Sequence, residues 1–80
     1  MKILFTKQAT KQIEKFDRPT KHRIKIAIEK IPLGDIKRLK GTSDTLFRLR
    51  VGNLRIIFEM NIDSIKIRSI LPRGEAYNNI

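Results

Sequence analysis

Arginine alternates with apolar residues in LFRLRVGNLRIIFEM, residues 46–60, which reads as two strands joined by a tight turn at Gly52-Asn53. Folding about this two-residue turn places Arg50 opposite Arg55. Like charges directly across a sheet destabilise it by up to roughly 1 kcal/mol per pair. The guanidinium fork donates two parallel hydrogen bonds to a phosphate or a carboxylate, so an anion between the two side chains would offset this repulsion. The spacing therefore predicts an anion site, and phosphate is the ligand that converging arginines favour.

The same reasoning extends the cluster to a third strand, SIKIRSIL, at about residues 64–71, after a four-residue turn over 61–64. The predicted cross-strand partners are Val51 and Leu54, Arg50 and Arg55, Arg48 and Ile57, Met60 and Ile65, Glu59 and Lys66, and Ile57 and Arg68. We expect Lys66 to pair with Glu59, the one carboxylate in this group. The arginines then left without a carboxylate are Arg48, Arg50, Arg55 and Arg68. Arg73, just beyond the third strand, can reach the same face.

Because successive strand residues point to opposite sides of a sheet, one face is predicted to be apolar and the other basic. The apolar face, which helices must cover, collects Phe47, Leu49, Val51, Leu54, Ile56, Phe58, Met60, Ile65, Ile67 and Leu71. The opposite, open face collects Arg48, Arg50, Arg55, Ile57, Glu59, Lys66, Arg68 and Ile70. A sheet that needed only solubility would mix charges of both signs, so the arginines favour a binding function.

Two helices are predicted ahead of this hairpin. KILF, residues 2–5, reads as a first strand, and Thr6 can cap a helix over about 7–16. Pro19 suits the first turn of a second helix that runs to about Ile31. The apolar stripes at helical spacing are Ala9, Ile13 and Phe16 on the first helix and Ile24, Ala27, Ile28 and Ile31 on the second.

Residues 32–44, PLGDIKRLKGTSD, are predicted to form an irregular connector with several basic side chains. The chain from 1 to 80 is then expected to be one domain of the α+β class. It has two layers, in which two helices pack on one face of a mainly antiparallel sheet, and its element order is β-α-α-β-β-β.

The composition limits the classes of function. Eighteen lysines and arginines against eight acidic residues give a net charge of +10, which favours RNA, DNA or an acidic protein as partner. The chain has no cysteine and its carboxylates are scattered, so we expect no metal site and a reducing, cytoplasmic setting. No apolar run approaches the roughly 18 residues that span a bilayer, so no membrane partner is expected.

The order of these elements resembles the RelE/ParE superfamily of bacterial and archaeal toxins, the toxin halves of toxin–antitoxin pairs. The resemblance covers nearly the whole chain. It rests on KILFTKQATKQIEKF at the start, LKG at the end of the connector, the hairpin LFRLRVGNLRIIFEM, and the tail RGEAY, which is similar to the R-G-[DE]-x-Y ending of RelE-like toxins. It implies a RelE-like fold, a cognate antitoxin as partner, and no small-molecule cofactor.

For RelE-type members, the resemblance implies metal-independent cleavage of messenger RNA in the ribosomal A site and hence inhibition of translation. Messenger RNA on the ribosome and ribosomal RNA are therefore expected partners. The catalytic positions carried over by the resemblance are Arg48, Arg50, Arg55, Arg73 and Tyr77. Candidate contacts to RNA or the ribosome are Lys37, Arg38, Lys40, Lys66 and Arg68, the first three of which are also candidates for antitoxin contact.

The proton acceptor stays open, because this chain has arginine at both first-strand positions where the best-known members carry lysine at one or both. Arginine stays protonated and is a poor general base. Either Tyr77, Glu59 or Glu75 takes the proton from the ribose 2′-hydroxyl, or positioning and electrostatics carry most of the rate.

Two other functions also stay open. A ParE-type toxin of the same fold would act on DNA gyrase without cleaving RNA, although the tail RGEAY favours the nuclease. A non-catalytic nucleic-acid-binding domain would be expected to carry aromatic stacking platforms on its basic face. None is predicted there, because Phe47 and Phe58 point to the core.

Overall fold

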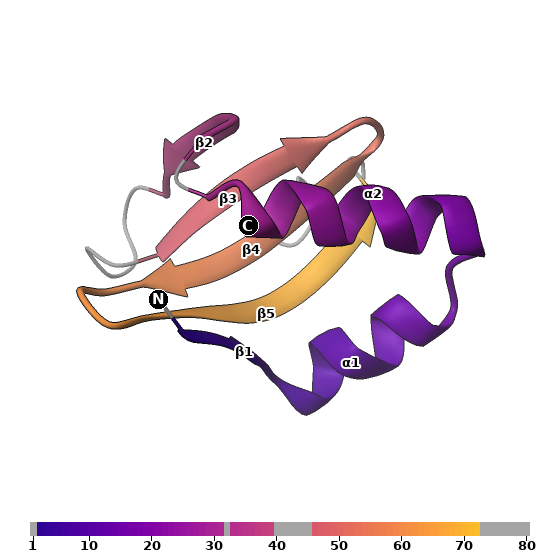
Figure 1. Ribbon diagram of the computed structural model, residues 1–80, viewed down its shortest axis with the longest axis horizontal. Helices are drawn as coiled ribbons and strands as arrows, with labels where there is room; N and C mark the ends of the chain where they lie inside the picture. Colours follow the sequence, from indigo (N-terminus) through magenta and orange to yellow (C-terminus); the bar gives the residue numbers. More distant parts are fainter. Residues whose placement is uncertain (1, 32, 40–45, 73–80) are drawn as a thin grey trace.

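The computed structural model describes residues 2–31, 33–39 and 46–72. Its elements, in chain order, are β1 (Lys2–Phe5), α1 (Lys7–Glu14), α2 (Arg18–Glu29), β2 (Asp35–Arg38), β3 (Leu46–Val51), β4 (Leu54–Met60) and β5 (Ser64–Pro72). The strands form a five-stranded sheet in the order β1-β5-β4-β3-β2, in which β1 runs parallel to β5 and the other pairs are antiparallel. The α2 helix lies across the sheet near β3, and α1 lies beside β1 and β5 (Figure 1). The predicted α+β class is confirmed.

Both helices begin where the sequence predicts, at side chains that accept hydrogen bonds from N–H groups of the first turn. Thr6 Oγ1 accepts from the Ala9 N–H at 3.1 Å, and Asp17 Oδ1 accepts from the Thr20 N–H at 3.0 Å. The hydrogen bonds from Thr20 lower the pKa of the Asp17 carboxyl. Pro19 lies in the first turn of α2, where its missing N–H leaves no hydrogen bond unmade.

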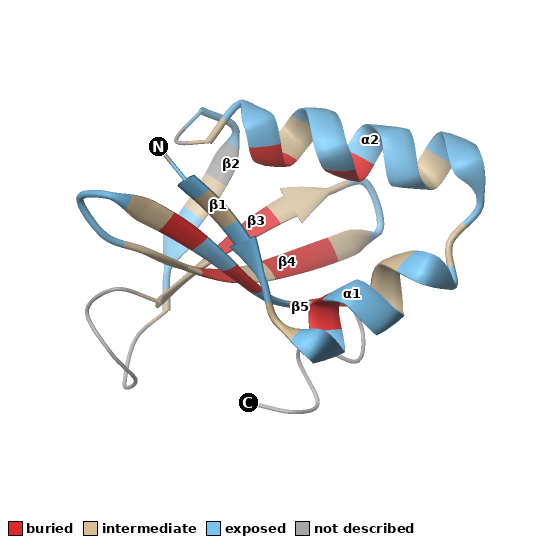
Figure 2. Ribbon diagram, turned by 60° about the horizontal axis from the view of Figure 1, so that its bottom comes forward, coloured by how far each residue is buried: buried red, intermediate tan, exposed pale blue. Residues whose placement is uncertain are grey.

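The apolar stripes of the helices and one face of the sheet form the core. Buried positions concentrate on the middle strands and on the helix turns that face them (Figure 2). The buried core consists of Ala9, Ile24, Ile28, Leu49, Ile56, Phe58, Ile65, Ile67 and Ile70. The Phe47 ring stacks on the Phe58 ring with centroids 5.7 Å apart, which adds a cross-strand contact between β3 and β4.

The segment predicted to be an irregular connector contains a strand, so that part of the prediction is wrong. β2 pairs antiparallel with β3, aligning Asp35 with Arg50, Ile36 with Leu49, Lys37 with Arg48, and Arg38 with Phe47. The sequence DIKR has one apolar residue and therefore no detectable alternation. Ile36 packs against the core, and the short, charged strand forms an edge of a kind that resists pairing with other chains.

A β-bulge interrupts the alternation of β5. The predicted pairs Met60 with Ile65 and Glu59 with Lys66 are confirmed. The predicted pair of Ile57 with Arg68 is wrong, because Ile57 pairs with Ser69 and Arg68 is the extra residue of the bulge. The side chains of β5 that follow the bulge therefore point to the face opposite the one predicted for them. Ile70, expected on the basic face, is in the core and 1% exposed, whereas Leu71 takes the face predicted for Ile70.

Beyond the end of β1, the start of α1 covers the edge of β5. The Thr6 N–H donates to the Ile67 carbonyl oxygen at 3.0 Å, and Thr6 Oγ1 donates to the Arg68 carbonyl oxygen at 2.8 Å. The Ile70 N–H donates to Gln12 Oε1 at 2.6 Å. These contacts satisfy backbone groups that would otherwise be open where β1 has ended, and they fix α1 against the bulge.

The bulge predicts which of two neighbouring apolar residues stabilises the protein. Ile70→Ala should lower the free energy of unfolding by about 2–5 kcal/mol, because it empties a buried site. Leu71→Ala should lower it by only about 1 kcal/mol, as for a typical partly exposed substitution. Urea unfolding followed by circular dichroism measures both. A larger loss for Leu71→Ala would indicate a sheet without the bulge.

Candidate nucleic-acid interface

Basic side chains gather on the face of the sheet opposite the helices. Cross-strand partners share a face, so the registers of β2 to β5 fix its members. We call this the basic face, and its described cations are Lys37, Arg48, Arg50, Arg55, Lys66 and Arg68. Six of the ten residues predicted as functional therefore lie on this face, five of them on β3, β4 and β5 and the sixth, Lys37, on β2.

The centre of the basic face is the predicted arginine pair. Arg50 and Arg55 are direct cross-strand partners, which places their Cβ atoms about 4.5–5.5 Å apart. Arg48 lies two residues before Arg50 on β3, and β2 adds Lys37 as the partner of Arg48. The same strand brings the backbone of Asp35 into register with Arg50. The three arginines expected to act on a phosphate are therefore neighbours.

The side chains of these three arginines are buried or half-buried and do not extend into solvent. Arg48 is 8% exposed, Arg55 is 5% exposed, and Arg50 is half-buried. Each of the three also interacts with the rest of the structure. Side chains held in this way are preorganised, and preorganised donors stabilise developing negative charge better than mobile ones. The expectation of a fully open face is wrong at these positions.

Glu59 pairs with Arg68 and not, as predicted, with Lys66. Its Oε1 accepts a hydrogen bond from Arg68 Nη1, in an ion pair whose arginine side chain is 51% and whose glutamate side chain is 31% exposed. Lys66 is the cross-strand partner of Glu59 through the backbone, but the bulge adds Arg68 as a competing cation on the same face. Arg68 therefore has a carboxylate partner, contrary to the prediction.

Arg38 is separated from the other predicted RNA contacts. It pairs with Phe47, whose side chain packs against the core, and its guanidinium carbon lies 5.7 Å from the centre of the Phe47 ring. Its neighbour Lys37 pairs with Arg48 on the basic face. Because side chains alternate along β2, Arg38 and Lys37 point to opposite faces of the sheet. Arg38 contacts the Phe47 ring on the helix side, whereas Lys37 extends the basic face.

The remaining predicted site residues, Lys40, Arg73, Glu75 and Tyr77, lie outside the described residues. Their part in the site stays a prediction. Within residues 2–31, 33–39 and 46–72, no three histidine, aspartate or glutamate side chains gather as metal ligands. No helix in that part of the chain is long and apolar enough to cross a bilayer.

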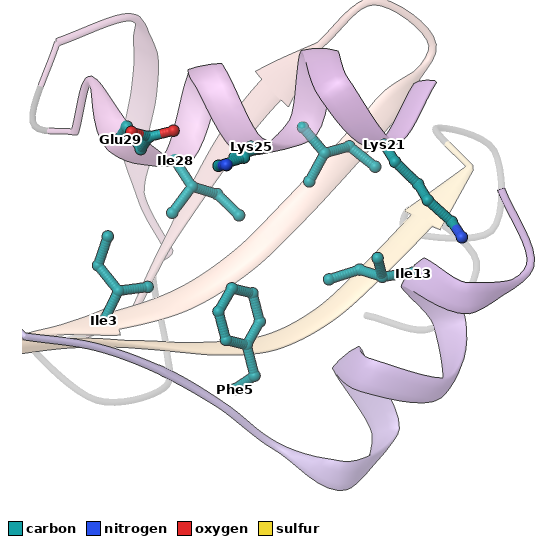
Figure 3. A pocket seen from close by; sticks show the side chains of 8 residues that line it. Ile3, Phe5, Ile13, Lys21, Lys25, Ile28 and Glu29 are labelled. Carbon is teal, nitrogen blue, oxygen red and sulfur yellow. The ribbon is translucent and has the colours of Figure 1, made fainter. Parts of the chain in front are cut away.

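The helix side carries an apolar groove of about 400 Å³ that the sequence reasoning missed. It is lined by Ile3, Phe5, Ile13, Lys21, Ile24, Lys25, Ile28 and Glu29, from β1, α1 and α2 (Figure 3). Phe5 faces this space and is 46% exposed. KILF gave no clear signal of the groove, because Ile3 and Phe5 alternate as they would on any strand that packs one face on a core.

The sequence matches the family model described as ParE toxin of type II toxin-antitoxin system, parDE, over residues 3–77. It is also 36% identical to Toxin RelE3 of Methanocaldococcus jannaschii over 86 residues, which cover 98% of this chain and 97% of that protein. The match therefore extends over the helices, the basic face and the tail.

Two solved structures are similar to this chain. The RelB-RelE antitoxin-toxin complex from Methanococcus jannaschii matches with a TM-score of 0.78 and 34% identity, over 96% of this chain and 98% of that one. The archaeal RelE-RelB complex from Pyrococcus horikoshii OT3 matches with a TM-score of 0.74 and 29% identity, over 91% and 94%. The resemblance to the RelE/ParE superfamily is confirmed.

Measurements of unfolding free energy can test the placement of Arg38 and Lys37 on opposite faces of the sheet. Arg38→Ala should lower the free energy of unfolding by about 0.5–1 kcal/mol, because it removes the contact with the Phe47 ring. Lys37→Ala should change it by less than about 0.5 kcal/mol, as for an ordinary surface substitution. Urea unfolding of the two variants, compared side by side, measures the difference. Equal losses would contradict the assignment of Arg38 to the helix side.

Proposed function

Since the chain belongs to the ParE toxin family of type II toxin–antitoxin systems, we propose that it is a RelE-type toxin that cleaves messenger RNA in the ribosomal A site, without a metal ion. The observation that carries the proposal is the Arg50–Arg55 pair with Arg48 beside it on one face. The 36% identity to a protein named Toxin RelE3 supports the RelE-type assignment within the family.

The proposed reaction is attack of a ribose 2′-oxygen on the adjacent phosphorus. The bond to the 5′-oxygen of the next nucleotide breaks, which leaves a 2′,3′-cyclic phosphate and a 5′-hydroxyl. The 2′-hydroxyl gives its proton to a base, and the departing 5′-oxygen receives one. Arg48, Arg50 and Arg55 hold the phosphoryl oxygens, where negative charge grows in the transition state.

Of the three candidate bases, Glu59 is the least suitable, because it forms an ion pair with Arg68. Its carboxylate accepts a hydrogen bond from Arg68, so it is already engaged. It stands two residues along β4 from Ile57, the partner of Arg48, and four from Arg55, the latter roughly 13 Å at about 3.3 Å per strand residue. A base must come within hydrogen-bonding distance of the proton that it removes. We therefore assign the proton transfer to Tyr77 or Glu75, with Arg73 as a further phosphate contact.

A cognate antitoxin is the second proposed partner, because the two similar archaeal structures are described as complexes of toxin and antitoxin. We assign the apolar groove beside Phe5 to an amphipathic segment of that antitoxin. Its apolar side would cover the isoleucines, and acidic residues at its edge would meet Lys21 and Lys25. Action on ribosomes implies a cytoplasmic setting.

The proposed activity is tested by translating a defined message in vitro with the purified protein and mapping cuts by primer extension. We expect ribosome-dependent cuts within A-site codons that persist in excess chelator. Arg50→Gln and Arg73→Ala should reduce cutting by at least about 100-fold, the scale for loss of one charge-stabilising donor.

The matched control is Arg18→Gln, which removes the same charge from the start of α2 and should cut normally. If the message stays intact and translation is normal, the protein is instead a gyrase-directed toxin of the same fold. Intact message with stalled translation would indicate a ribosome-binding protein without chemistry.

The antitoxin groove gives a separate prediction. Phe5→Ser should leave toxicity in place but prevent neutralisation, because it removes an apolar contact of roughly 1.5–3 kcal/mol from the interface. Growth of cells that express toxin and antitoxin together provides the measurement. Ile62→Ser is the control, since Ile62 is 91% exposed and lies in the β4–β5 turn, outside the groove. Equal neutralisation of the two variants would rule out this docking site.

A further inference from the structure

A second, more polar pocket lies at the tip of the β3–β4 hairpin, where it meets the corner between α1 and α2. Its volume is about 280 Å³. We call it the hairpin-tip pocket, and it is lined by Phe16, Thr20, Arg23, Val51, Gly52, Asn53 and Leu54. Its lining residues come from the β3–β4 turn with the strand ends beside it, from the first half of α2, and from Phe16 ahead of that helix. Figure 1 shows where the turn and the helix lie in the fold.

The lining of this pocket joins an apolar floor to a polar rim. Phe16, Val51 and Leu54 are half-buried and supply the floor. Thr20, Arg23 and Asn53 supply a hydroxyl, a guanidinium and an amide at the rim. A planar heteroaromatic ring suits this combination, because its faces stack on aromatic or guanidinium planes and its edge carries hydrogen-bonding groups.

The glycine of the turn lies beside Arg23 in this pocket. Gly52 has φ of +57°, whereas Asn53 has a negative φ, as expected when glycine takes the first central position of a two-residue hairpin turn. A side-chain carbon at Gly52 would stand 3.9 Å from Arg23 Nη1. A Cβ there would make an ordinary contact with the guanidinium, so the turn backbone and Arg23 lie close together at the pocket, and the positive φ is what favours glycine at this position.

The hairpin-tip pocket and the basic face lie on opposite sides of the same hairpin end. Val51 and Leu54, which flank the turn, contribute to the pocket. The next pair inward, Arg50 with Arg55, points to the basic face. An RNA strand held at that arginine pair is therefore one residue pair away from the turn, and the following nucleotide can pass over Gly52 to the helix side.

We propose that the hairpin-tip pocket receives one base of the RNA strand that the basic face holds. This inference rests on the proposed function, since it takes that RNA as its ligand. The volume is just below the roughly 300 Å³ at which sites for drug-sized ligands begin, which fits a single base. The base stacks between Phe16 and Arg23, and its edge faces Thr20 and Asn53.

A neutral ring suits this pocket better than an acidic peptide does. The carboxylate of Asp17, at the start of α2, lies near enough to Arg23 for the guanidinium charge to contribute to the lowering of the Asp17 pKa. A carboxylate ligand on Arg23 would meet that like charge, whereas a stacked base adds none. The apolar groove beside Phe5 lacks such a polar rim and is the better place for a protein segment.

The test measures binding of short single-stranded RNA by fluorescence anisotropy at fixed low salt. The RNA series carries one abasic nucleotide moved along the strand. With the wild-type protein, one abasic position should weaken binding by about 5- to 100-fold, the range for loss of one stacked base. With Arg23→Gln, intact RNA should bind as weakly as that abasic RNA, and the abasic substitution should have no further effect.

Arg18→Gln is the matched control, because it removes one positive charge from the same helix outside the pocket. It should retain the full response to the abasic position. Equal weakening by Arg23→Gln and Arg18→Gln, or no abasic position with an effect, would overturn the pocket assignment. So would an Arg23→Gln protein that binds RNA normally but escapes its antitoxin.

The two proposals fail separately. If the wild-type protein shows no abasic response but still cuts messenger RNA on ribosomes, the pocket proposal is wrong and the nuclease proposal stands. If the protein shows an abasic response that depends on Arg23 but makes no cuts, the pocket is a base-binding site and the nuclease proposal is wrong.

Discussion

The arrangement of the molecule depends on one extra residue in β5. At the bulge, Arg68 and Ser69 stand where the partner strand supplies Ile57 alone. Without this insertion Ile70 would leave the core, since alternation would turn it to the basic face. The bulge also places Arg68 beside Glu59, and its backbone groups receive α1 through Thr6 and Gln12. Core packing, helix attachment and the charge pattern are thus set at the same place.

The basic face is held by the core behind it. Arg48 and Arg50 flank Leu49 on β3, and Arg55 precedes Ile56 on β4, and both apolar residues are buried. Because strand neighbours point to opposite sides, packing on the helix side fixes the positions of the arginines on the other. A flexible loop could present the same charges, but it would not hold Arg50 and Arg55 in one register. Their placement opposite one another is a consequence of a register that the core demands.

Most of the fold and the centre of the candidate site could be predicted from the sequence, because the signals were local. A two-residue turn with glycine determined the register of β3 and β4, and Thr6 and Pro19 marked the helix starts. The bulge could not be predicted, because SIKIRSIL is compatible with regular alternation, and only packing against α1 decides which of Ile70 and Leu71 is buried. The strand β2 escaped prediction for the opposite reason, since its short polar sequence contains no pattern and it forms only by pairing with β3.

The parallel pairing of β1 with β5 also determines when the protein can fold. The first strand of the chain hydrogen-bonds only to the last, with Ile3 opposite Ile65 and Phe5 opposite Ile67 in the described part of the sheet. During synthesis, Thr6 at the end of β1 must wait for Arg68, 62 positions later, and α1 must wait for Ile70, which lies 58 positions after Gln12, so the closing contacts are distant in sequence. The ribosome must therefore have synthesised β5 before this sheet can close. A truncated product that lacks β5 has neither the bulge nor a place for α1, and it also lacks Lys66 and Arg68 of the basic face.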